Sequence, residues 1–168
     1  VNDPVSQSNR FEHMMDLSDW AVAKEPDLLV WPEASLPPFW VLNPTNVIRR
    51  MEQLEKAIAE QSVWRVWGAD TATNNVPYNS AVLVPPEDSF LRGLEKMKWP
   101  YYAKRHLVMF GEYVPFSEQL PFLKKLAPVG NFGRGGGEVV FDMGKAATSV
   151  IICFEDVVPK LARLSPYQ

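Results

Sequence analysis

The stretch L-L-V-W-P-E-A-S-L-P at residues 28–37 places a carboxylate directly after a short apolar run. Residues 28–30 are typical of a short buried β-strand, and Pro32 marks its end. Glu33 is therefore expected just past the C-terminal end of a strand. Ligands of open α/β sheets bind at that edge, so Glu33 is a candidate functional residue.

Two other segments repeat this arrangement. Lys104 follows the β-type run at 101–103, and Cys153 follows the β-type run at 148–152. Cys153 is the only cysteine in the chain, so it is either an inert core residue or a nucleophile. A Glu, a Lys and a Cys in this order, each after a β-type run, resemble the Glu-Lys-Cys triad of the nitrilase (carbon–nitrogen hydrolase) superfamily.

Longer motifs narrow the resemblance to the apolipoprotein N-acyltransferase family within that superfamily. The segments are W-P-E-A-S-L-P at 31–37, Y-A-K-R-H-L-V at 102–108, F-G-E-Y-V-P at 110–115 and I-C-F-E-D at 152–156. The block from K-R-H-L-V to F-G-E-Y-V-P is the most specific, and the match runs from about residue 27 to 163. Met109 departs from the family pattern, where Pro is usual, as does Phe154, where a Tyr usually follows the cysteine. Neither is a triad member.

The resemblance implies a role for each candidate site residue. Cys153 is the nucleophile, and Glu33 is the general base that takes its proton. Lys104 stabilises the oxyanion that forms on the substrate carbonyl. Glu112 is an additional active-site glutamate that keeps the lysine charged and oriented, and Glu155 is a supporting residue.

The three triad residues also have plainer explanations. A lone cysteine after an apolar run is commonly a buried, inert side chain. Glu33 could be a solvated loop residue, and Lys104 could lie at the surface with its stem along apolar neighbours. The convergence of the motifs favours the catalytic interpretation.

Composition limits the remaining function classes. The chain has 168 residues and a net charge of −3, which suits a domain with a substantial core and gives no reason to expect nucleic-acid binding. His13 and His106 lack metal-ligand spacing, so no metal is expected. The glycine-rich stretch at 130–137 lacks the context of a dinucleotide site, so no cofactor is expected. No run of about 20 apolar residues is present to span a membrane.

Periodicity predicts alternating helices and strands, which indicates an α/β fold. Helices are expected at 6–24, from Thr45 or Asn46 onward, at 118–126, and from Val157 after a cap at Asp156. Strands are expected at 27–31, 63–68, 80–84, 139–142 and 147–152, with a turn-rich, hairpin-like connection at 71–78 and a loop at 131–137. The resemblance implies a nitrilase-type α-β-β-α sandwich. It implies that residues 1–168 are a partial domain, incomplete at both ends, and we expect the isolated chain to be inactive.

The resemblance also implies the reaction. An acyl chain passes from a phospholipid to the cysteine as a thioester, and then to the N-terminal amine of a lipoprotein, without a cofactor. The implied location is the bacterial inner membrane, with the catalytic domain on the periplasmic side and membrane association through parts of the protein outside this chain. Two alternatives remain open: a soluble nitrilase-type amidase, in which water replaces the amine, and a non-catalytic binding or scaffold domain.

Overall fold

The computed structural model describes residues 4–35, 44–89, 99–116, 119, 122 and 132–164. The chain divides into two compact units. The first contains residues 1–68 and 82–100, and the second contains residues 69–81 and 101–168. Glu33 thus lies in the first unit, whereas the other candidate site residues, Lys104, Glu112, Cys153 and Glu155, lie in the second.

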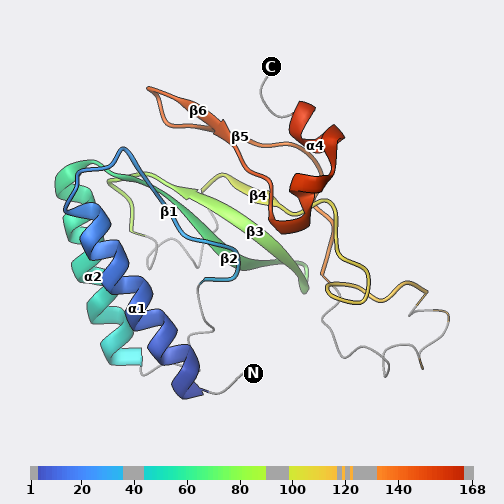
Figure 1. The fold of residues 1–168 in the computed structure, drawn as a ribbon, viewed down its shortest axis with the longest axis horizontal. Helices are drawn as coiled ribbons and strands as arrows, with labels where there is room; N and C mark the ends of the chain where they lie inside the picture. The colour runs from blue at the N-terminus through green and yellow to red at the C-terminus, as the bar shows by residue number, and fades with distance from the viewer. Residues whose placement is uncertain are drawn as a thin grey trace. The chain divides into compact units, whose positions relative to one another are not determined.

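Two helices and a parallel strand pair form the first unit. Helices α1 (Pro4–Val22) and α2 (Pro44–Gln61) lie side by side (Figure 1). Strand β1 (Leu28–Val30) pairs in parallel with β2 (Trp64–Thr73), with Leu28 opposite Trp64. The predicted helix at 6–24 and strand at 27–31 are therefore confirmed within a few residues.

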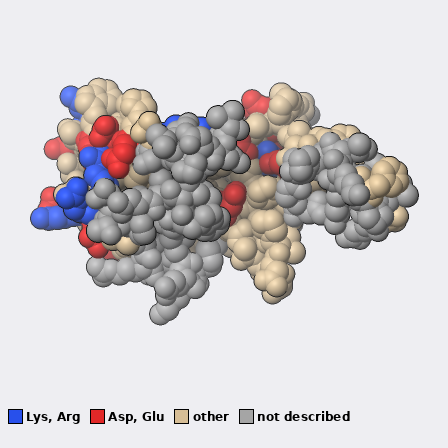
Figure 2. All heavy atoms as spheres, turned by 90° about the horizontal axis from the view of Figure 1, so that it is seen from below, with Lys and Arg blue, Asp and Glu red and all other residues tan. Residues whose placement is uncertain are grey.

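The helices bury the apolar positions that helical periodicity selects. The buried residues are Phe11, Met15, Ser18 and Val22 on α1 and Met51, Leu54 and Ile58 on α2. Between the two helices, Arg50 Nη2 on α2 donates to Asp16 Oδ1 at 2.8 Å and to Asp19 Oδ2 at 3.2 Å on α1. Charged side chains of both signs gather over α1 and α2 in Figure 2. The helices thus present one face to the core and one to solvent.

The main sheet has the strand order β1-β2-β3-β4, with β3 at Val76–Val84 and β4 at Tyr101–Ala103. The predicted strands at 63–68 and 80–84 are confirmed but extend further. The hairpin-like connection expected at 71–78 is therefore present, but its turn is shorter than predicted. Only Asn74 and Asn75 form the turn, with φ values of 52° and 62°. Two successive residues at positive φ match the twist of flanking strands, and asparagine tolerates that conformation. A two-residue turn lets the strands continue through the polar sequence.

A second, two-stranded sheet lies in the second unit. Strand β5 (Val140–Asp142) pairs antiparallel with β6 (Ala147–Ser149), with Val140 opposite Ser149. The expected strand at 147–152 therefore ends early, at Ser149. The 3₁₀-helix η2 (Cys153–Val157) follows, and then helix α4 (Pro159–Leu164).

The last helix, predicted from Val157, is present but begins two residues later, and Asp156 lies within η2 instead of capping it. Pro159 opens α4, because proline has a preset helical φ and needs no N–H at the first helical position. The helix predicted at 118–126 lies outside the described residues, apart from Gln119 and Phe122. Within the described residues, no helix is both long and apolar enough to cross a membrane.

Candidate active site

Lys104 follows β4 directly and is held by a carboxylate. Its Nζ donates to Glu112 Oε1 at 2.8 Å, and the side chain is only 1% exposed. Asn79 Nδ2 donates to the same Glu112 oxygen at 2.9 Å, and the Val108 N–H donates to Oε2 at 2.8 Å. These contacts fix the lysine ammonium at the end of its strand, as predicted for a positioned cation rather than a surface lysine.

The contacts also set the charge state of Glu112. Burial raises the pKa of this carboxyl, but hydrogen bonds from Lys104, Val108 and Asn79 and the lysine charge outweigh burial, so the net pKa lies below its ordinary value. The pair is therefore an ammonium and a carboxylate at neutral pH. Because the pKa of folded Glu112 is depressed, its ionisation stabilises the fold above about pH 4.5, and this contribution disappears as pH falls through the depressed value.

Glu155 is a buried hub between two chain segments. Its side chain is fully buried. Oε1 accepts from the Arg105 N–H at 2.8 Å and the His106 N–H at 3.0 Å, and Oε2 accepts from the Ile152 N–H at 2.8 Å. The Tyr102 hydroxyl lies 2.9 Å from Oε1 and 2.8 Å from Oε2. One carboxylate thus ties the residues after Lys104 to the residue before Cys153.

Cys153 lies exposed at the start of η2, with φ at 53°. A positive φ is uncommon for a residue with a Cβ and places the thiol on a sharp turn. In α/β-hydrolases, the nucleophile occupies a comparable strained strand-to-helix turn, which presents the reactive atom outward. Because the chain turns here, Cys153 and Glu155 do not point the same way, as they would have done on a continuing strand.

In the 3₁₀ turn, the position of a residue decides whether its side chain is buried or exposed. Residues three apart lie above one another in a 3₁₀-helix. Ile152 and Glu155 are buried, whereas Ile151, Phe154 and Val157 are exposed by 37%, 58% and 63%. We call these last three residues the apolar stripe. An exposed apolar surface therefore adjoins the thiol on its own turn.

Glu33 lies two residues beyond Trp31, the last buried residue at the end of its strand, as the sequence predicted. Trp31 anchors the segment: its Nε1 donates to Ser18 Oγ at 2.9 Å, and its ring packs edge-on against Trp67 with the centroids 4.0 Å apart. Both the N–H and the hydroxyl of Ser35 donate to the Gly68 carbonyl at 3.1 Å. A Cβ on Gly68 would collide with the Pro32 carbonyl, so only glycine allows this close approach.

The structure brings together four of the five predicted site residues. Lys104 contacts Glu112, and Glu155 links the segment after Lys104 to that before Cys153. The position of Glu33 relative to these four stays a prediction. Two hydrogen-bonding residues, Asn79 and Tyr102, were not predicted as site residues. Asn79 belongs to no motif, and Tyr102 is the first residue of the Y-A-K-R-H-L-V segment, in which only the lysine was assigned a role.

The two departures from the family pattern are both exposed. Met109 is 54% exposed and forms a bridge with Tyr113, in a loop closed by a hydrogen bond from the Phe110 N–H to the Tyr113 carbonyl at 2.8 Å. Phe154 is part of the apolar stripe. The loop that carries Glu112 thus closes without the proline.

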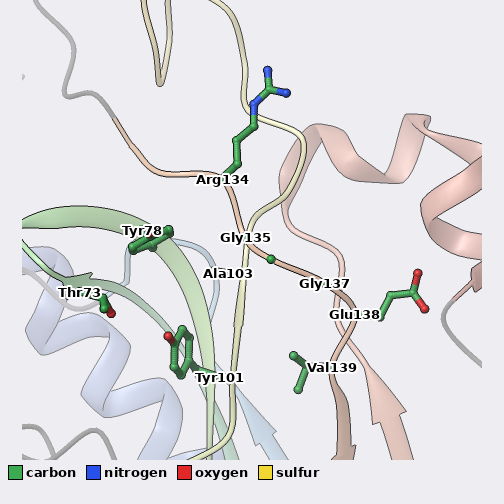
Figure 3. Close-up of a pocket in the computed structure, with 10 residues that line it drawn as sticks. Thr73, Tyr78, Tyr101, Ala103, Arg134, Gly135, Gly137, Glu138 and Val139 are labelled. Atoms are coloured by element: carbon green, nitrogen blue, oxygen red, sulfur yellow. The ribbon is translucent and has the colours of Figure 1, made fainter.

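A separate open pocket of about 340 Å³ lies in the second unit (Figure 3). Thr73, Tyr78, Tyr101 and Ala103 line it together with residues 134–139. Gly135 closes against β4, since its N–H donates to the Lys104 carbonyl at 2.9 Å. Among the residues that the structure describes, no cluster of three or more His, Cys, Asp or Glu side chains could hold a metal ion.

Comparisons with known proteins identify the family of this chain. The profile of the carbon–nitrogen hydrolase family matches residues 3–166. Curated relatives include the apolipoprotein N-acyltransferase of Geobacter metallireducens, which is 34% identical over 96% of this chain and 30% of its own length. The apolipoprotein N-acyltransferase of Bdellovibrio bacteriovorus is 35% identical over 89% of this chain and 28% of its own length. The chain thus spans about a third of the length of these relatives.

Solved structures share the fold. An amidase from Nesterenkonia sp. superposes with a TM-score of 0.54 at 18% identity, over 96% of this chain and 54% of that protein. At this identity the likeness concerns the fold alone. The predicted nitrilase-type α/β architecture is confirmed.

Proposed function

The chain belongs to the carbon–nitrogen hydrolase family, and we propose that it carries the reacting residues of an N-acyltransferase. The observation that carries the proposal is the exposed Cys153 on a turn that Glu155 ties to the strand end bearing Lys104. A nucleophile and an oxyanion-stabilising cation are the two groups that acyl transfer through a thioester requires. The names of the relatives favour apolipoprotein N-acyltransferase as the specific activity.

In the first step, the Glu33 carboxylate takes the thiol proton of Cys153, and the sulfur attacks the ester carbonyl of a phospholipid. The Lys104 ammonium stabilises the oxyanion. Collapse of the tetrahedral intermediate breaks the ester C–O bond, and Glu33 returns the proton to the departing alkoxide of the lysophospholipid. The product is a thioester on Cys153. The negative charge that Glu112 keeps beside Lys104 maintains the ammonium in its charged form.

In the second step, the N-terminal amine of a lipoprotein attacks the thioester carbonyl. Glu33 accepts a proton from the amine, an amide bond forms, and the C–S bond breaks. The proton returns to the sulfur, which restores the thiol. No redox partner or cofactor enters either step. The reaction is therefore a two-step transfer with a covalent intermediate.

The apolar stripe favours a lipid acyl group over a small amide. A chain attached to Cys153 Sγ emerges beside Ile151, Phe154 and Val157, whose exposed side chains can cover its methylenes. Each buried methylene contributes about 0.8 kcal/mol. The family of the relatives, and not the stripe, is the ground for placing the reaction at the bacterial inner membrane, on its periplasmic side, where a phospholipid donor and a lipoprotein acceptor meet.

Mass spectrometry of the intact protein tests the proposal. The full-length protein is incubated with phospholipid vesicles, and its mass is expected to rise by one acyl group on Cys153. Adding a peptide with an N-terminal lipid-modified cysteine should then remove the acyl group and yield the amide. Loss of the acyl group in buffer alone, at an equal rate, would favour the amidase alternative. Absence of any adduct would favour a non-catalytic domain.

Replacing Lys104 with methionine is expected to slow acylation by about 10²–10³, the usual effect of removing one oxyanion donor. Methionine keeps most of the side-chain volume in this buried position but removes the charge. Without the lysine, Glu112 loses the group that most lowers its pKa, so that pKa should rise. Burst kinetics of acyl-enzyme formation check the rate. A normal burst in this variant would refute the role of Lys104.

Replacing Val157 with serine is expected to lower the preference for long acyl chains. The rate ratio for a sixteen-carbon over a four-carbon donor should fall about fivefold, which corresponds to roughly 1 kcal/mol of lost apolar contact. Val140→Ser is the matched control, because Val140 is another exposed valine of this unit, on β5. An equal change in both variants would exclude a specific role for the stripe.

A further inference from the structure

We propose that Tyr102 is a positioning residue for the nucleophile and acts through Glu155. The inference rests on the proposed function, because it assigns Tyr102 to the acylation step at Cys153. Tyr102 does not touch the thiol in this arrangement; its hydroxyl contacts the carboxylate that fixes the turn carrying the thiol.

The orientation of Tyr102 separates it from its neighbour on β4. The Tyr102 side chain is 1% exposed and contacts Glu155. Tyr101, one residue earlier on the same strand, lines the open pocket with Tyr78 and Thr73 (Figure 3). Successive side chains of a strand point to opposite faces. Two adjacent tyrosines thus face different surroundings, and only one of them reaches the hub.

The hydroxyl of Tyr102 completes the coordination of Glu155. The carboxylate already accepts three backbone N–H groups, from Arg105, His106 and Ile152. The tyrosine adds a side-chain donor to these three, and Arg105 Nε lies 3.4 Å from the tyrosine oxygen. A buried carboxylate has few other donors available to it, because water is excluded.

Tyr102 keeps its proton across the physiological range. Burial raises its pKa, a hydrogen bond from Arg105 opposes this, and the bond and charge of Glu155 raise it further, to about 12. The hydroxyl therefore stays a donor to the carboxylate at any pH at which the enzyme would work. A constant donor holds the carboxylate in one orientation.

The orientation of the Glu155 carboxylate affects the thiol through one hydrogen bond from the backbone. Glu155 Oε2 accepts from both the Tyr102 hydroxyl and the Ile152 N–H, the residue before Cys153. Cys153 has a positive φ, which surrounding contacts must maintain. If Oε2 turns away, the Ile152 N–H loses its partner and the turn relaxes. The sulfur then leaves its position relative to the oxyanion site.

Tyr102→Phe tests the inference, with Tyr101→Phe as the matched control on the same strand. In the full-length protein, Tyr102→Phe is expected to lower the acylation rate constant by about 10–100-fold, the range for a small misplacement of a reacting atom. The donor KM should stay within about twofold, because the buried tyrosine is not part of the apolar stripe. Tyr101→Phe should retain the wild-type rate constant. The rate of Cys153 alkylation by iodoacetamide, followed by peptide mass, should fall in Tyr102→Phe only.

Other outcomes overturn the inference. A rate constant within twofold of wild type, an equal fall in both variants, or a change confined to KM would each exclude a positioning role. If Tyr102→Phe does not fold, Arg105→Met removes the bond to the tyrosine oxygen and should lower the rate constant about threefold, the effect of a weak hydrogen bond. Wild-type kinetics in that variant would equally exclude the inference. An active Cys153→Ala would instead refute the proposed function itself.

Discussion

Replacing Cys153 with alanine is expected to abolish acyl transfer in the full-length protein without unfolding it. The thiol is the only one in these 168 residues, and it lies exposed on the turn that Glu155 ties to the segment after Lys104. The thiolate is the nucleophile that a thioester requires. Because Cys153 is exposed, its loss should change the free energy of unfolding by no more than about 0.5 kcal/mol. Intact-mass detection of the acyl-enzyme, together with a melting curve, measures both effects.

Serine at position 153 should also be inactive, since a hydroxyl is far harder to ionise than a thiol. Asp156→Asn provides the matched control: Asp156 is also exposed and lies three residues along the same 3₁₀-helix. It should retain acylation close to the wild-type rate. An acyl adduct on the alanine variant would mean that another residue is the nucleophile.

The sequence alone was sufficient for the strand ends that carry Glu33 and Lys104. Both depend on local signals: a short apolar run, and in the first case a proline that stops the strand. The buried faces of α1 and α2 followed from helical periodicity for the same reason. Residues within about ten positions of one another determine these features, and a periodic pattern in the sequence covers the same range.

The turn at Cys153 was not predictable in this way. Residues 150–152 are apolar and β-branched, which favours a strand continuing to the cysteine, yet β6 ends at Ser149. The bonds that hold the turn come from Arg105 and His106, 50 and 49 residues away from Glu155. Asn79 likewise reaches Glu112 across 33 residues. Contacts over such separations produce no periodic pattern in a single sequence. The resemblance therefore located Glu155 but not the hydrogen bonds that it accepts.

Replacing Glu33 with glutamine is expected to slow thioester formation by about 10²–10⁴, the contribution of a positioned general base. Glutamine keeps the size of the side chain but cannot accept the thiol proton. The effect should fall on acylation itself and not only on resolution of the thioester, because proton removal from Cys153 precedes attack. Rapid-mixing measurement of the acyl-enzyme burst separates the two steps. Glu25→Gln, another exposed glutamate of the first unit, should behave as wild type.

The loop that carries Glu33 offers a second test of the same role. Gly68 lies against the Pro32 carbonyl and the Glu33 Cα, and its own carbonyl accepts both bonds from Ser35. A methyl group at position 68 must push this loop away from β2. Gly68→Ala is therefore expected to lower the acylation rate by about 10², the effect of displacing a reacting group by about 1 Å, although residue 68 carries no chemistry. A normal acyl-enzyme burst in Glu33→Gln would refute Glu33 as the base. If Glu33→Gln acylates slowly while Gly68→Ala acylates at the wild-type rate, Glu33 keeps its role as the base. That result would show that the loop does not need its close approach to residue 68.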